Sequence, residues 1–93
     1  MSRSEIGRRA MQAYLQAHGW DGPCRWGHYR KSAKDGTLYR AKFQAHTVRF
    51  EMQVEHEAGE YWSASKSWVR FKGARFSQID PANVPAAITR SYV

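Results

Sequence analysis

The chain has 93 residues, including four Trp, five Tyr and four Phe, and carries a formal net charge of +7. This length predicts a single domain, residues 1–93, whose modest core draws on the aromatic side chains. The single cysteine, Cys24, excludes an internal disulfide, and the lack of a long apolar stretch excludes a membrane span, so the sequence predicts a cytoplasmic protein.

The first expected element is a helix over residues 4–18. Ser2 and Glu5 have the spacing of a capping box, which satisfies backbone N–H groups at the start of a helix. Gly7 is expected to weaken the first turn, and Gly19 is well placed to end the helix. Apolar residues repeat with the spacing of a helix face packed on a core: Ile6, Ala10, Met11, Tyr14, Leu15 and Ala17.

From residue 25 the period changes to two, which predicts strands. Residues 25–32 form the first strand, and residues 34–36 form a hairpin turn, because the Asp-Gly pair tolerates positive φ angles. The apolar side chains of the next strand occupy odd positions up to Ala45 and then even positions from Val48 onwards. We expect a bulge or corner at residues 45–47 in one long bent strand, because no Gly or Pro indicates a tight hairpin there.

The rest of the chain predicts a turn at residues 57–60, a further strand that ends at Gly73, and short helical segments. Asp80 and Pro81 fit the start of a helical turn, and Pro85 permits a short helix through Ile88 and Arg90. Together these elements predict an α+β fold in which the N-terminal helix packs on a curved antiparallel sheet of about four strands, with a short C-terminal helical turn.

A partly closed, SH3-like barrel is the alternative architecture, because two expected bends suit a sheet that curls. In either fold the helix and the sheet share one core. Its expected members are Ile6, Met11, Tyr14, Leu15, Tyr39, Phe43, Val48, Phe50, Met52, Val54, Val69 and Phe71.

Strand alternation places basic side chains and Trp residues on the face away from this core. Cations follow phosphate groups, and exposed aromatic rings stack on bases. The sequence therefore predicts a non-enzymatic binding module that contacts nucleic acid, or a nucleic-acid-handling complex, through this face. The alternative is a solvated face whose Trp rings cover a second, minor core. The expected contact residues are Arg30, Arg40, Lys42, Lys66, Trp68, Arg70 and Lys72, with Trp26, His28 and Gln44 on the same face.

The acidic residues are concentrated elsewhere. Residues 51–60 contain four Glu and no Lys or Arg, and an acidic tip beside a basic body suits docking on a protein with a complementary surface. The alternative function is therefore a phage or mobile-element accessory protein that blocks a host defence protein. An unpaired sheet edge would also allow two copies to form a homodimer.

The sequence also contains residues that could form an acid–base catalytic site or a zinc site. His56, Glu57, Glu60 and Tyr61 place acid–base groups around one turn, which makes a small nuclease a third alternative. Cys24 and His28, with His46 or His56, offer potential zinc ligands, but structural zinc sites usually contain paired cysteines. The sequence therefore predicts neither a metal nor another cofactor.

Overall fold

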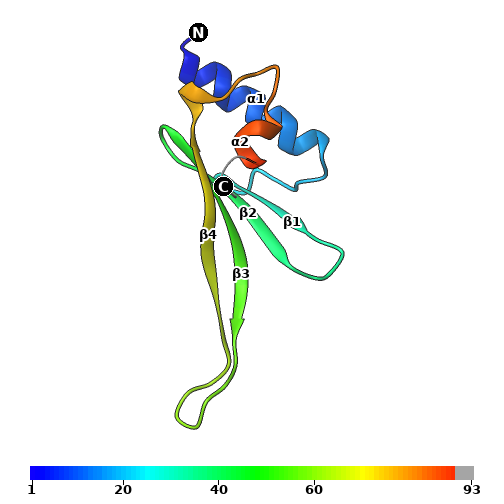
Figure 1. Ribbon diagram of the computed structural model, residues 1–93, viewed down its shortest axis with the longest axis vertical. Helices are drawn as coiled ribbons and strands as arrows, with labels where there is room; N and C mark the ends of the chain where they lie inside the picture. Colours follow the sequence, from blue (N-terminus) through cyan, green and yellow to red (C-terminus); the bar gives the residue numbers. More distant parts are fainter. Residues whose placement is uncertain (90–93) are drawn as a thin grey trace.

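The computed structural model describes residues 1–89 (Figure 1). Its elements follow in the order helix, four strands, 3-10 turn and short helix. They are α1 (Arg3–Ala17), β1 (His28–Ser32), β2 (Leu38–Phe43), β3 (Thr47–His56), β4 (Ser65–Arg75), η1 (Phe76–Gln78) and α2 (Pro85–Thr89). The predicted α+β fold is confirmed, while the predicted extension of the last helix to Arg90 lies outside the described residues.

The strands form one open antiparallel sheet in the order β1-β2-β3-β4, so the barrel alternative is wrong for the described residues. In Figure 1, α1 and α2 lie at one end of the molecule, and β3 and β4 continue beyond β2 as a two-stranded arm. The molecule measures 54 × 24 × 24 Å as a result. The arm ends in the loop of residues 57–64, and β4 begins only at Ser65.

Helix α1 begins and ends where its capping residues predict. The Ser2 hydroxyl accepts a hydrogen bond of 3.1 Å from the Glu5 N–H. At the other end, the Trp20 N–H donates to the Leu15 carbonyl at 3.0 Å, and Gly19 adopts a φ of +81°. This closing geometry requires a left-handed residue, which Gly supplies at little cost.

Gly7 serves a purpose that the sequence does not reveal. It is buried where α1 crosses η1, and a Cβ added there would overlap the carbonyl oxygen of Phe76 and lie 2.7 Å from its carbonyl carbon. The residue expected to weaken the helix is therefore the one that lets α1 approach the backbone of η1.

The connection from β2 to β3 is a tight hairpin, so the predicted bulge or corner in one long strand is wrong. Phe43 pairs with Val48, and the Gln44 N–H donates to the Thr47 carbonyl at 2.8 Å. This leaves residues 45–46 as a two-residue turn. Because directly opposed residues share a face, the hairpin accounts for the change of apolar phase from odd to even positions.

Contacts from other elements stabilise this turn, which contains neither Gly nor Pro. The Arg8 Nη2 group of α1 donates to the carbonyls of Gln44, at 2.9 Å, and Ala45, at 2.8 Å. The Phe76 N–H donates to the His46 carbonyl at 2.9 Å. Three successive carbonyls thus find donors outside the hairpin, and this replaces the local turn signal that the sequence lacks.

A β-bulge in β4 reverses the expected orientation of Lys72. Phe50 pairs with Lys72 and Glu51 with Arg70, so Phe71 is the additional residue. Lys72 consequently shares a face with Phe50 and is only 5% exposed. The prediction that Lys72 lies on the solvent face beside Arg70 is wrong, because strand alternation does not continue across a bulge. Strand β4 also continues past Gly73 to Arg75.

The core lies between α1, η1, α2 and one face of the sheet. Ile6 and Val69, which were expected in it, are exposed, and Met52 and Val54 are half-buried. Tyr29 of β1 and Phe76, Ile79 and Val84 after β4 are further core residues that the predicted set does not include. The buried apolar residues are Met11, Leu15, Tyr29, Ala41, Val48, Phe50, Phe76, Ile79 and Val84.

Two shorter segments refine the predicted boundaries. Residues 25–27 form a turn, so β1 starts three residues later than expected. The Asp80 carboxylate accepts a hydrogen bond from the Ala82 N–H at 2.9 Å, which makes a turn, and helix α2 starts at Pro85. Within residues 1–89, neither helix has the length and apolar character needed to cross a membrane.

Candidate nucleic-acid interface

The sheet face opposite α1 is rich in cations. The strand register gives its rows, since residues paired across neighbouring strands point to the same side. One row runs from Arg30 through Arg40 and Glu51 to Arg70, and the next from His28 through Lys42 and Arg49 to Gly73. Arg75 follows, paired with Thr47. The single carboxylate in these rows is that of Glu51.

Glu51 neutralises one of these cations. Its carboxylate accepts a hydrogen bond of 2.6 Å from the Arg40 Nε, and the two side chains are 8% and 16% exposed. The Arg40 guanidinium also lies over the Trp68 ring, 4.3 Å from the ring centroid. Arg40 is therefore held between an acid and an aromatic ring, and one face of Trp68 is covered.

Lys66 lies further out, on the arm. Its Nζ is 3.5 Å from a carboxylate oxygen of Glu55, and both side chains are largely exposed. Such a pair contributes little stability, but it lowers the local positive charge. The expected contact residues therefore differ in their surroundings: Arg40 and Lys66 each form an ion pair, and Lys72 lies on the core side.

An open groove of about 580 Å³ lies near the C-terminal end of β4. Arg49, Arg70 and Arg75 line it, and none of its lining residues in the described part of the chain is Asp or Glu. Gly73 also lines the groove and pairs with Arg49 across the β3–β4 ladder. Among the described residues, a Cβ added to Gly73 would contact the Val48 carbonyl oxygen at 3.6 Å, so there is room for a Cβ at this position.

The pKa of His28 reflects the positive charge of the same face. Burial lowers the pKa of its imidazole below the usual range, and the neighbouring charges of Arg40, Lys42 and Arg30 lower this pKa further. Glu51 acts in the opposite direction but does not outweigh them. The neutral imidazole is favoured because its protonation would add one more positive charge to this surface.

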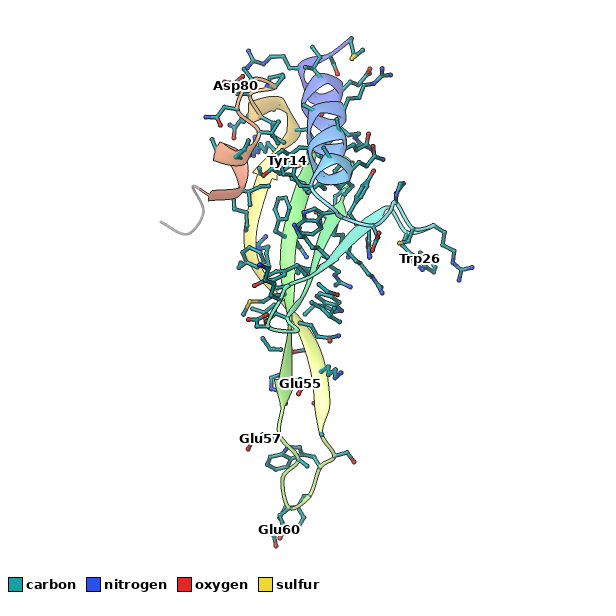
Figure 2. All side chains as sticks on the ribbon, turned by 90° about the vertical axis from the view of Figure 1, so that its right-hand side faces the viewer. Tyr14, Trp26, Glu55, Glu57, Glu60 and Asp80 are labelled. Carbon is teal, nitrogen blue, oxygen red and sulfur yellow. The ribbon has the colours of Figure 1, made fainter. Side chains whose placement is uncertain are left out.

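The structure thus brings together part of the predicted site. Arg30, Lys42 and Arg70 share the open face with Arg40, whereas Trp26 projects from the turn before β1 (Figure 2). Two groove residues, Arg49 and Arg75, were absent from the predicted set. A hairpin turn at residues 45–46 places Arg49 directly across from Lys42. Arg75 was not predicted on this face because the strand was expected to end at Gly73, whereas β4 continues to Arg75.

The arm carries the acidic end of the molecule. Figure 2 shows Glu60 at its extreme tip, with Glu57 and Glu55 further back. Tyr61 is 86% and Trp62 is 62% exposed, and the Trp62 indole N–H donates to the Glu57 carbonyl at 3.1 Å.

The four acid–base residues of the predicted nuclease alternative lie at the end of β3 and in the loop that follows it. His56 Nε2 lies 2.7 Å from the Ser67 hydroxyl, whereas Glu57, Glu60 and Tyr61 are exposed on the loop. Within residues 1–89, no group of three or more His, Cys, Asp or Glu side chains is arranged to hold a metal ion. In comparisons with protein-family models, curated proteins and solved structures, no match to this chain was found.

Proposed function

We propose that the protein binds nucleic acid through the open sheet face. The observation that carries this proposal is the acid-free groove lined by Arg49, Arg70 and Arg75, continuous with Lys42 across the sheet. None of these three guanidiniums takes part in an ion pair within residues 1–89, so their charge is available to a polyanion.

The contacts are made mainly to phosphates rather than to bases. Trp68, the ring expected to stack on a base, already has Arg40 over one of its faces. Trp26 is well exposed but stands apart from the basic rows. Binding is therefore expected to depend on charge and salt more than on sequence. A cytoplasmic location, where the exposed thiol of Cys24 stays reduced, fits this role.

Fluorescence anisotropy with labelled oligonucleotides tests the proposal. The logarithm of the affinity should fall linearly with the logarithm of the salt concentration, with a slope of about 0.9 per phosphate neutralised on duplex DNA and about 0.7 on single strands. Arg70→Ala should weaken binding and make this slope shallower by nearly one unit. Arg9→Ala is the matched control, because Arg9 is an exposed cation on α1. No binding at low salt would refute the proposal.

The arm favours a second candidate function, docking on a protein. Exposed rings at Tyr61 and Trp62 beside three glutamates suit a partner with a basic rim around an apolar pocket. Such a partner could be a host protein that the chain blocks. A pull-down from cell extract, with and without nuclease treatment, separates the two functions: capture that survives nuclease and is lost in Tyr61→Ala supports the arm.

A further inference from the structure

The unpaired positive charge of the open face is greatest near the C-terminal end of β4. Along the face towards the arm, Glu51 engages Arg40 and Glu55 engages Lys66. At the other end, Arg49, Arg70 and Arg75 line the groove at Gly73, and none of the groove's lining residues within 1–89 is Asp or Glu. Cations spaced along a line match a phosphodiester chain, and a group of unpaired cations at one end of that line matches a compact anion of high charge.

The strand register explains why these three arginines line one groove. Arg49 faces Gly73 directly across the β3–β4 ladder, and Arg75 lies two residues further along β4 on the same side. Arg70 reaches the groove from the other direction, because the bulge at Phe71 puts Arg70 and Gly73 on the same face despite their odd spacing. The bulge that removes Lys72 from the face therefore also places Arg70 beside the groove.

The chemistry of the lining specifies the anion. A guanidinium is a planar donor that binds phosphate oxygens in pairs and remains charged at any physiological pH. A phosphomonoester carries a charge of about −1.5 to −2 at pH 7 and exposes three oxygens, whereas a phosphodiester carries one charge and exposes two oxygens. Three guanidiniums that line one groove therefore favour the monoester.

We propose that this groove is a binding site for a phosphomonoester, and specifically for the terminal phosphate of a nucleic-acid strand. The inference rests on the proposed nucleic-acid function, which supplies the strand. Arg49, Arg70 and Arg75 bind the phosphate oxygens, and Gly73 leaves the space that the phosphate occupies. The rest of the strand continues across the open face past Lys42 towards Arg30. The same chemistry is offered by a free mononucleotide, which the experiment distinguishes from a strand end.

The test compares oligonucleotides of one sequence that carry either a phosphate or a hydroxyl at the 5′ or the 3′ end. The wild-type protein should bind one phosphorylated end about tenfold more tightly than the matching hydroxyl end. Gly73→Val should reduce this preference, because the added side chain would occupy space at the groove. The φ of Gly73 is not positive and the nearest contact of its Cβ is ordinary, so the variant is expected to fold, which circular dichroism checks.

Arg75→Gln should reduce the preference, and Arg9→Gln should not. If a mononucleotide competes as strongly as the phosphorylated oligonucleotide, the groove binds the phosphomonoester itself, whatever it is attached to. If it competes only at much higher concentration, the strand end is the ligand. Equal binding of phosphate and hydroxyl ends would overturn this inference and leave the proposed function standing. Failure of every oligonucleotide to bind would refute the proposed function instead.

Discussion

The close approach of α1 to η1 makes Gly7→Ala an informative substitution. In an ordinary helix interior this change stabilises the protein by about 0.5–1 kcal/mol, because Ala loses less backbone entropy on folding. Here the added Cβ would overlap the Phe76 carbonyl oxygen, which belongs to the backbone and cannot rotate away. Helix α1 must therefore move away from η1, and this loosens the contacts that Met11 and Leu15 make in the core.

Overpacking of this kind typically costs about 1–3 kcal/mol, which exceeds the gain in helix propensity. We expect the free energy of unfolding to fall by about 1–2 kcal/mol net and the melting temperature to fall by about 4–8 °C per kcal/mol. Chemical denaturation followed by circular dichroism measures the effect. Ala13→Gly at an exposed position of the same helix is the control and should cost about 0.5–1 kcal/mol. A stabilised Gly7→Ala variant would refute the close approach.

Three further predictions concern the contacts of Arg8 with the β2–β3 turn, the Arg40–Glu51 ion pair and His28. Arg8→Ala removes the donors for the Gln44 and Ala45 carbonyls and should cost about 1–3 kcal/mol in urea denaturation, whereas the neighbouring Arg9→Ala should cost under about 0.5 kcal/mol. Glu51→Gln should also cost about 1–3 kcal/mol because Arg40 loses its charged partner, yet the same variant should bind oligonucleotides more tightly at low salt; weaker binding would contradict the assignment of the face. The lowered pKa of His28 means that the unfolded chain binds its proton more readily, so the stability it contributes is complete above about pH 6.5 and is lost as the pH falls through the lower folded pKa. His28→Gln should therefore flatten the decline in denaturation midpoint below that pH, and an unchanged pH profile would contradict the shift.

Local signals in the sequence predicted the elements whose ends are capped locally. Ser2 and Gly19 set the bounds of α1, and Asp35-Gly36 marks the β1–β2 turn, because each acts on neighbouring backbone groups. Local signals could not predict the β2–β3 hairpin, because the donors to its carbonyls are distant in the sequence. Arg8 lies 36 residues before Gln44, and Phe76 lies about 30 residues after His46.

For the candidate site, too, the sequence predicted what depends on a single strand and not what depends on the pairing of two strands. Alternation correctly placed Arg40 and Lys42 on the open face, because no irregularity interrupts β2. Alternation predicted the wrong face for Lys72, because the bulge depends on how β4 pairs with β3 and no residue type at 70–72 indicates a bulge. The pairing of Arg40 with Glu51 was equally hidden, since it requires the register between two strands rather than the spacing within one.

The opposite charges at the two ends of the long axis give the molecule an electric dipole. The acidic loop at residues 57–64 lies beyond the end of β3, and along that strand His56 is seven residues, about 23 Å, from Arg49. If the partner is a polyanion, as proposed, its field exerts a torque on this dipole that turns the groove towards the partner and the arm away from it before the surfaces touch. A larger fraction of diffusional encounters then has the orientation needed for binding, which raises the association rate constant at low ionic strength. The bound molecule would present its acidic, aromatic tip to the solvent, where a second macromolecule can reach it.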